Sequence, residues 1–492
     1  MSNLVVLPVL LPLTTGILLL FLHGRLRLQR VIALLSLVVG LGLALFLANR
    51  VWSSGIQVGF ASAWKAPFGI TLAVDLFGAM MLVLSSLASL LAVWFGMHSL
   101  DAGRERFFYY PLTQFLLVGI NLSFVTGDLF NLYVAFEVML IASYFLATLG
   151  GAPGQLREGF KYLVLNVIAS TLFLLAITLL YSSTASLNMA DVAAKVAQVH
   201  DEPIITLVGV LFLLTFGMKG ALFPLFVWLP GAYRQASPAV AAIFASMLTK
   251  VGVYALIRVM TLIFNHDPAF FKPILLVLVG GTMLLGIAGA IGSKDVKLAL
   301  CYQLISHVGY MVMGLALGTE SGLAGALFYI ANHVLVIAGL FLLAGVIEAV
   351  TGTTALSGFR GLFGSHPGLG YLFLGFSFAM AGIPPFAGFF AKFALLREAF
   401  AQGSYVLGGV ALLTGLLTLF GMVQLFRRGF WGEPMGERRA VPNYRAMLAP
   451  AVLLLVLIFG AGVGAGPVYR YVAAAAQQLA DPSIYIQAVM GR

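Results

Sequence analysis

Charged residues and cysteine are scarce in this 492-residue sequence, and each shortage excludes a class of protein. Only 9% of the residues are Asp, Glu, Lys or Arg, whereas a soluble domain carries about 25%. The single cysteine, Cys301, excludes an internal disulfide, a thiolate metal cage and an iron–sulfur cluster held by this chain alone. No polar stretch is long enough to form a soluble domain. We therefore expect a lipid-embedded chain with no cofactor and no metal site.

Long apolar runs make up most of the chain. Hydrophobic residues make up 61% of the chain, and a run of about 18 or more predicts a transmembrane helix. The first run has no basic residue before it and no small-residue cleavage site after it, so we expect a retained helix and not a signal peptide. The sequence predicts an all-α membrane protein, a single polytopic domain over 1–492, with about fourteen spans at residues 4–22, 30–49, 73–97, 107–127, 129–149, 162–182, 205–230, 238–264, 273–292, 299–317, 321–349, 371–400, 404–426 and 449–472.

The net charge of +10 is explained by orientation in a membrane, and not by nucleic-acid binding. Of the 27 Lys and Arg residues, four lie inside predicted spans away from their ends. The loops after odd-numbered spans hold sixteen of the others, and the opposite side holds seven. Because basic loops stay in the cytoplasm, this bias predicts that both termini lie outside, as an even number of spans requires.

Glu137 and Lys219 lie too deep in their predicted spans to reach water. Glu137 is nine residues after Asp128 and thirteen before Gly150, roughly 13 to 20 Å from either end. Lys219 is near the middle of the span at 205–230. Charged side chains at this depth are rare and mark ion or proton pathways. Asp128 sits at the end of its span, where a helix cap is the expected role.

Two further lysines belong to the same group. Lys250 is twelve residues after Pro238 and fourteen before Phe264, and Lys392 is displaced toward the exterior end of the span at 371–400. One deep Glu and three deep Lys cost on the order of 10 kcal/mol on the translocon scale. A purely structural bundle would carry leucine at these positions, so we expect these four residues to have a role in function.

Three other polar residues allow a second interpretation. Arg258 is nearer to the end of its span, where it can snorkel to the interface or form a structural ion pair. His307, in "YQLISHVGYM", and His333, in "FYIANHVLVIAGLF", are central. A membrane histidine can simply hydrogen-bond a neighbouring helix, but as members of a polar series these two favour proton transfer.

Prolines interrupt two of the predicted helices. Pro224 removes a backbone donor and clashes with the carbonyl four residues earlier, and Pro384 does the same in the twelfth span. Such breaks in corresponding positions of two half-repeats indicate a transport pathway. We expect inverted half-repeats at 107–264 and 273–426, with helices 7 and 12 broken and a hydrated pocket beside Lys219. The matched residues are Phe216, Met218, Gly220 and Pro224 against Phe378, Met380, Gly382 and Pro384.

These residues carry a family resemblance that covers essentially the whole chain. The stretches "GIQVGFASAWKAPFGI", "TGDLFNLYVAFEVMLIASY", "FGMKGALFPLFVWLPGAY", "LTKVGVYALIRV" and "GIPPFAGF" resemble the antiporter-like subunits shared by respiratory NADH:quinone oxidoreductase, membrane-bound hydrogenases and Mrp-type antiporters. Within that group the chain is similar to the D subunits of Mrp-type Na+/H+ antiporters. Gly231 follows "WLP", where the respiratory subunits usually carry an acidic residue.

The resemblance implies a proton relay. Glu137 is expected to pair with Lys219 and control its proton, Lys250 to be the central relay, and Lys392 the terminal group on the exit side. His307 and His333 are expected to bridge the middle with water. One departure concerns Ile337, which stands where the family commonly has a lysine, so that His333 and water must carry that step or the relay is weaker there.

Three functions of different classes remain open. The first is a proton-translocating subunit of a multisubunit cation/proton antiporter, a secondary transporter and not an enzyme, in a bacterial plasma membrane. The second is the proton-pumping arm of a redox complex, and the third is a structural bundle that seals a complex. We expect other membrane subunits as partners. Because Glu137 is the only deep carboxylate, sodium is expected to be handled wholly or partly by those partners.

Overall fold

Long apolar helices make up most of the chain in the computed structural model, which describes residues 3–61, 64–433 and 439–491. Within these ranges, thirteen helical spans are long and apolar enough to cross a membrane. One further crossing is made by two shorter helices, α17 (Pro367–Ala381) and α18 (Ala387–Ala401). Each of the predicted spans therefore corresponds to helix in the structure, and the all-α class is confirmed.

The N-terminal half of the chain contains the following elements: the 3₁₀ turn η1 (Asn3–Val6), α1 (Leu7–Phe21), α2 (Leu26–Ser54), β1 (Gln57–Phe60), β2 (Thr71–Val74), α3 (Leu76–Ser99), α4 (Ala102–Arg104), the π-helical turn η3 (Glu105–Tyr109), α5 (Tyr110–Val125), α6 (Leu129–Ala147), α7 (Pro153–Thr184), α8 (Met189–Val199), α9 (Pro203–Gly220), α10 (Trp228–Gln235), α11 (Pro238–Ile243), the π-helical turn η4 (Phe244–Leu248) and α12 (Thr249–Leu262).

The C-terminal half continues with α13 (Pro268–Gly292), α14 (Val296–Leu317), α15 (Glu320–Thr351), the 3₁₀ turn η5 (Leu356–Gly358), α16 (Leu362–Ser365), α17 and α18, α19 (Tyr405–Gly429), α20 (Tyr444–Val463), α21 (Ala465–Ala480) and α22 (Pro482–Met490). The predicted breaks in the seventh and twelfth spans are confirmed, since α9 is separated from α10 and α17 from α18.

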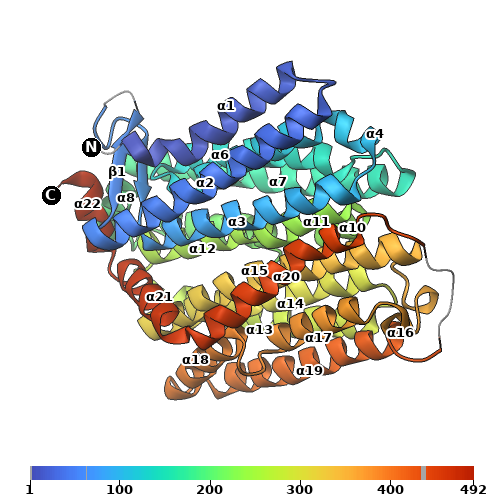
Figure 1. Ribbon diagram of the computed structural model, residues 1–492. Helices are drawn as coiled ribbons and strands as arrows, with labels where there is room; N and C mark the ends of the chain where they lie inside the picture. The colour runs from blue at the N-terminus through green and yellow to red at the C-terminus, as the bar shows by residue number, and fades with distance from the viewer. Residues whose placement is uncertain (1–2, 62–63, 434–438, 492) are drawn as a thin grey trace.

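The helices run side by side across Figure 1, with α1 and α2 at one edge, α19 at the other and α15 between them. Both termini lie at one end of the bundle, near β1, α8 and α22, whereas α10 and α16 lie at the opposite end (Figure 1). Two termini at the same end agree with an even number of crossings. The outside location of that end stays a prediction.

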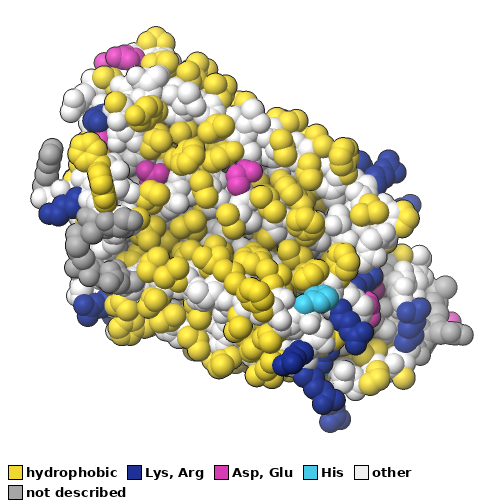
Figure 2. Space-filling model, turned by 90° about the horizontal axis from the view of Figure 1, so that it is seen from above, with side chains coloured by type: hydrophobic (Ala, Val, Ile, Leu, Met, Phe, Trp, Pro, Cys, Tyr) yellow, Lys and Arg dark blue, Asp and Glu magenta, His cyan; other side chains and the backbone are white. Residues whose placement is uncertain are grey.

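The helices that carry Lys250, His307 and His333 are among the most buried ones. The span formed by α11, η4 and α12 is entirely enclosed by protein, and α14 and α15 are nearly so. By contrast, α2, α7, α13 and α19 expose most of their apolar surface. Figure 2 shows such a face, yellow across its middle, with dark blue Lys and Arg side chains gathered mainly at the end where α10 lies in Figure 1. Lys219, Lys250 and Lys392 are thus surrounded by protein, whereas Glu137 is only partly buried.

Matching features support the two half-repeats. Asp128 caps α6 by accepting a hydrogen bond from the Asn131 amide at 2.8 Å, and Asp295 caps α14 in the same way. Each capping residue also forms a backbone bridge to the segment that follows a 32-residue helix, α7 or α15. The first bridge is at the α8 end and the second at the α10 end (Figure 1), so the repeats are inverted. Their limits at 107–264 and 273–426 stay a prediction.

Two features at the terminal end were not predicted. Strands β1 and β2 pair antiparallel, with Gln57 opposite Val74 and Phe60 opposite Thr71. The last predicted span, 449–472, is also wrong at its end. It stops at Val463, and after Gly464 the chain begins α21, because Pro467 has no backbone N–H and fits only the first turn of a helix.

Candidate functional site

Lys219 lies one residue before the end of α9 and is buried. Its Nζ donates a hydrogen bond to Ser170 Oγ of α7 at 3.2 Å and stands 4.8 Å from the centre of the Phe136 ring. Backbone groups freed by the break are bound by protein. The Trp228 indole donates to the Met218 carbonyl at 2.9 Å, and the Phe223 amide donates to Thr282 Oγ1 at 2.8 Å. The expected hydrated pocket beside Lys219 stays a prediction.

Glu137 lies on an exposed face of α6. The large side chains one and two turns away on this face, Val134, Ile141 and Phe145, are all exposed. Glu137 is only half-buried, but its Oε1 atom is buried and has no hydrogen-bond partner among the described residues. A carboxylate on an apolar, outward-facing surface requires a polar or charged neighbour.

The expected ion pair between Glu137 and Lys219 is not formed in this structure. None of the ion pairs within residues 3–61, 64–433 and 439–491 joins these two side chains. The physical reason is that Ser170 and the ring of Phe136 occupy the positions next to the ammonium. Lys219 therefore reaches α6 at Phe136, the residue next to Glu137, and not at the carboxylate.

Lys250 follows the π-helical turn η4 in the enclosed span. Its Nζ donates to the Ala245 carbonyl in that turn at 2.6 Å. A π-helical turn frees carbonyls from the regular helical ladder and occurs often at functional sites. Here α12 also touches α9: a Cβ added at Gly252 would lie 2.5 Å from the Gly220 nitrogen and 2.7 Å from the Lys219 carbonyl carbon. The segments that carry Lys219 and Lys250 are therefore in direct backbone contact.

His307 and His333 form the middle of the polar series. Their ring centres are 5.4 Å apart. His307 Nδ1 is hydrogen-bonded to the Tyr329 hydroxyl, and its Nε2 lies 3.4 Å from Thr418 Oγ1. Both nitrogens of His333 are buried without a partner among the described residues. The Tyr329 ring centre also lies 5.9 Å from Lys392 Nζ, so His333, His307 and Lys392 gather around one tyrosine.

Lys392, in α18, binds the end of α17 across the break between the two helices. Its Nζ donates to the carbonyls of Met380 and Ala381 at 3.0 Å each, which are the last carbonyls of α17. The same ammonium lies 4.9 Å from the centre of the Tyr310 ring and 5.9 Å from that of Tyr329. Because a helix C-terminus has unsatisfied carbonyls and a partial negative charge, this is a favourable place for a buried cation.

Arg258 forms a structural ion pair, one of the two roles expected for it. Its NH2 group is 2.5 Å from Asp75 Oδ2, and both side chains are buried. It also donates to the Tyr254 hydroxyl at 3.3 Å and faces the rings of Tyr254 and Tyr485. Asp75 was missed by the sequence analysis, because it is 183 residues away from Arg258 and sits at the start of a helix.

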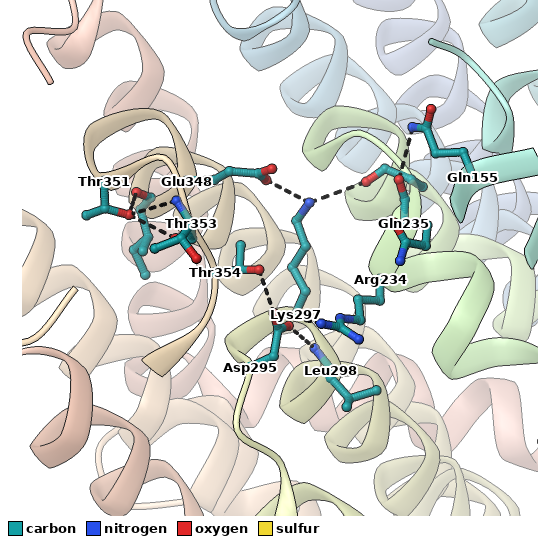
Figure 3. Close-up of polar contacts among 12 residues, drawn as sticks. Gln155, Arg234, Gln235, Asp295, Lys297, Leu298, Glu348, Thr351, Thr353 and Thr354 are labelled. Carbon is teal, nitrogen blue, oxygen red and sulfur yellow. Dashed lines mark hydrogen bonds and ion pairs between the residues drawn. The ribbon is translucent and has the colours of Figure 1, made fainter. Parts of the chain in front are cut away.

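A second polar network was also missed, at the α10 end of the bundle (Figure 3). Lys297 Nζ is 2.7 Å from Glu348 Oε2, and Arg234 is 3.4 Å from Asp295 Oδ2. Thr354 donates to the same Asp295 oxygen at 2.6 Å. Arg234 lies in the range predicted for the first half-repeat and the other four in that predicted for the second, so the network joins these two parts of the chain. In the sequence, these five residues lie in loops or near the ends of predicted spans, where charged and polar side chains are common, so nothing marked them as a network.

No group of three or more His, Cys, Asp or Glu side chains in the described parts of the chain is placed to hold a metal ion. The only cysteine, Cys301, is buried. The chemistry that the described residues offer is the exchange of protons among lysine, histidine, tyrosine and carboxylate groups.

Comparisons with known proteins agree with this geometry. The model of the family described as "NADH:quinone oxidoreductase/Mrp antiporter, TM" matches residues 126–418. The chain is 46% identical over 491 residues to a protein of Alkalihalophilus pseudofirmus that is named as the D subunit of a Na(+)/H(+) antiporter, and the match covers all of both chains.

Two solved structures share the fold. A chain of the Mrp complex from Dietzia sp. superposes with a TM-score of 0.92 at 30% identity and full coverage of both chains. A chain of the archaeal membrane-bound sulfane sulfur reductase reaches the same TM-score at 25% identity, covering 99% of this chain and all of that one. With deep lysines, paired broken helices and a family match over more than half of its length, the chain belongs to the NADH:quinone oxidoreductase/Mrp antiporter family of membrane proteins.

Proposed function

We propose that this chain is the proton-translocating D subunit of a multisubunit Na+/H+ antiporter. The observation that carries the proposal is the kind of partner that the three deep lysines have. Lys219, Lys250 and Lys392 are buried, and each ammonium donates only to a neutral hydroxyl or carbonyl oxygen among the described residues. A buried ammonium with no carboxylate in contact is costly, and it can lower that cost by releasing its proton.

Arg258 provides the contrast within the same bundle. Its guanidinium is locked against Asp75 at 2.5 Å and stays charged, because arginine does not release its proton in proteins. The chain thus separates a permanent structural charge from three exchangeable ones. This difference supports a relay along Lys219, Lys250, His333, His307 and Lys392.

The relay begins with the charge state of Glu137. When Glu137 is ionised, its electrostatic interaction with Lys219 favours the ammonium. Protonation of Glu137 removes that attraction, and Lys219 passes its proton toward Lys250 on the adjoining helix. The histidine pair then carries the charge to Lys392, which holds it at the end of α17. Both ring nitrogens of His333 lack a partner among the described residues, which supports its role despite the apolar Ile337 one turn further along α15.

Partner subunits are required by the position of Glu137. A carboxylate in mid-span on an exposed apolar face is expensive in lipid. We therefore propose that another membrane subunit covers this face of α6 and supplies a polar group to Glu137. We propose that sodium is handled wholly or partly by such partners, because Glu137 is the only deep carboxylate of this chain.

Relatives favour the antiporter over a redox complex. The fold does not distinguish them, because the Mrp chain and the sulfane sulfur reductase chain superpose equally well. Sequence identity distinguishes them, because this chain is 46% identical to an antiporter D subunit and 25% identical to the reductase chain. We accordingly propose a secondary transporter subunit in a bacterial plasma membrane, and not a catalytic subunit.

The proposal is tested by replacing Lys219. We expect Lys219→Ala to lower proton-coupled transport about 100-fold, the scale typical of a lost proton-transfer group, with normal assembly of the complex. Transport is measured from the dissipation of a pH gradient in everted membrane vesicles after sodium is added. Lys195→Ala is the matched control, because Lys195 is a partly exposed lysine paired with Asp191 at 2.8 Å. Full transport by an assembled Lys219→Ala complex contradicts the relay.

The choice between antiporter and redox complex is tested separately. Mass spectrometry of all proteins that co-purify with the chain in mild detergent is expected to show small hydrophobic subunits and a larger antiporter-like chain. Flavin or iron–sulfur subunits in stoichiometric amounts would assign the chain to a redox pump instead.

A further inference from the structure

An open pocket of about 720 Å³ lies where α13 and α19 end, and four of its six lining residues are cationic. Lys294 follows the end of α13 by two residues, Arg427 and Arg428 are in the last turn of α19, and Arg360 comes from the segment before α16. The backbone of α16 joins this site through the Phe363 amide, which donates to the Phe430 carbonyl at 2.9 Å. All four cations belong to loops that the charge bias assigns to the cytoplasmic side.

Three of the four cations have no carboxylate partner in the described parts of the chain. Within residues 3–61, 64–433 and 439–491, no ion pair includes Lys294, Arg427 or Arg428. Asp295 is next in sequence to Lys294, but its oxygens are taken by Arg234, Thr354 and the Leu298 amide (Figure 3). Cations that converge without an acidic partner favour an anionic ligand.

An apolar stripe on α19 leads into the pocket. Leu416, Phe420 and Val423 are exposed, and they lie four and three residues apart, with Arg427 four residues further on. Residues at this spacing share one face of a helix. Along this face a hydrocarbon surface therefore ends at a cluster of positive charge.

Trp431 comes two residues after the end of α19, and its indole is exposed. Tryptophan is enriched where a membrane meets water, so it places the pocket at the interface and not in the aqueous loops. The adjoining helix α13 packs against α19 here, since a Cβ added at Gly421 would contact Ile291 at 3.4 Å. Arg427 lines the pocket and also lies on the face of the stripe, so the pocket and the stripe together form one continuous amphiphilic site, which we term the groove.

We propose that this groove binds an anionic phospholipid of the cytoplasmic leaflet. The phosphate is held by Lys294, Arg360, Arg427 and Arg428, and one acyl chain lies along Leu416, Phe420 and Val423. Basic pockets between membrane helices on the cytoplasmic side bind anionic headgroups in this way. The apolar stripe favours a lipid over a free phosphate ion, because a phosphate ion has no hydrocarbon that could pack against the stripe.

Native mass spectrometry of the complex, purified with its partner subunits and delipidated, tests the proposal. Phosphatidylglycerol is titrated against the wild type, Arg427→Gln/Arg428→Gln and the control Arg25→Gln/Arg27→Gln. The control removes the same charge from two exposed arginines of another cytoplasmic loop. Since each arginine near a membrane surface contributes about a fivefold effect, we expect the pocket variant, which lacks two, to bind roughly 30-fold more weakly, with the control unchanged.

Two further ligands separate the possible sources of the anion. Phosphatidylcholine is expected not to compete, because its headgroup has no net charge, and inorganic phosphate is expected not to displace the bound lipid at millimolar concentration. Equal affinity of the pocket variant and the control overturns the proposal, as does displacement by inorganic phosphate, which would assign the pocket to a free anion. A third variant, Phe420→Asp, keeps all four cations and is expected to weaken phosphatidylglycerol binding but not binding of inorganic phosphate.

Discussion

At the scale of single residues, the identity of the nearest oxygen separates the buried cations of this protein. Arg258 contacts a carboxylate, whereas Lys219, Lys250 and Lys392 contact hydroxyl or carbonyl oxygens. A carboxylate in contact stabilises a fixed charge, and a neutral oxygen serves both the protonated and the neutral amine. The arginine therefore belongs to the framework and the lysines to the proposed relay.

Replacement of Arg258 tests this division. Arg258→Met leaves Asp75 buried without its cation, and such a loss is expected to cost about 3–5 kcal/mol of the free energy of unfolding. In Asp75→Asn/Arg258→Met the charge is removed from both partners, and asparagine still caps α3, where Asp75 Oδ1 now accepts from the Gly78 amide at 2.8 Å. We expect the double variant to recover most of the stability in a thermal unfolding assay and to transport protons. A double variant that is stable but inactive would move Arg258 into the relay.

At the scale of helices, close backbone contacts and broken ends position the lysines. The Gly220–Gly252 contact brings α9 and α12 together beside Lys219 and Lys250. The end of α17 supplies the carbonyls that hold Lys392. Lys250 and Lys392 each donate to a carbonyl at an irregularity in a helix, the π-helical turn η4 or the end of α17, and a regular helix offers no free carbonyl for this purpose.

A methyl group at Gly252 is expected to separate these helices. Gly252→Ala introduces a Cβ at 2.5 Å from backbone atoms that cannot rotate away, so we expect a loss of about 1–3 kcal/mol in unfolding free energy and slower transport. The control is Gly280→Ala in α13, where an added Cβ meets nothing within 4 Å. That variant is expected to be neutral or more stable by about 0.5–1 kcal/mol. Equal thermal midpoints for the two variants would contradict the close contact.

Two substitutions of Lys392 separate its roles in binding carbonyls and in carrying a proton. Lys392→Gln keeps a donor for the Met380 and Ala381 carbonyls, whereas Lys392→Met keeps none. We expect both variants to lose proton transport, because neither side chain exchanges a proton. Only Lys392→Met is expected to lose stability as well, by about 1–3 kcal/mol for the unsatisfied carbonyls. Transport by either variant, measured in everted vesicles, shows that the relay ends elsewhere.

At the scale of the whole molecule, α15 lies in the middle of the bundle and both termini lie at one end (Figure 1). The Arg234–Asp295 ion pair crosses between the halves at the opposite end. Basic loops on that same end, including the proposed lipid groove, give the bundle a definite polarity. This polarity, together with the outward-facing Glu137, is consistent with a chain built to work among other membrane subunits.

Cysteine labelling tests the orientation. In a Cys301→Ala background we expect Gln487→Cys, in α22, to react with a membrane-impermeant maleimide in intact cells. Arg27→Cys, near the start of α2, is expected to react only after the membrane is opened. Both positions are exposed, so access to the reagent depends on the side of the membrane. The reverse pattern would place the termini inside and the proposed lipid groove in the outer leaflet.

Hydropathy and depth by themselves determined much of this protein. Span positions, the two broken helices and the deep residues Glu137, Lys219, Lys250 and Lys392 follow from the sequence, because the cost of placing a charge or a proline in lipid depends on its position along a helix. Family resemblance then supplied the expected roles.

Only the tertiary structure decided which groups meet. It placed Ser170 against Lys219 in place of Glu137, joined Asp75 to Arg258, and gathered Lys294, Arg360, Arg427 and Arg428 around one pocket. These contacts come from helices far apart in the chain. Their formation depends on how the helices cross and on how each helix is rotated about its axis. An apolar helix is equally stable in lipid in many rotations, so its sequence alone does not specify which side chains meet.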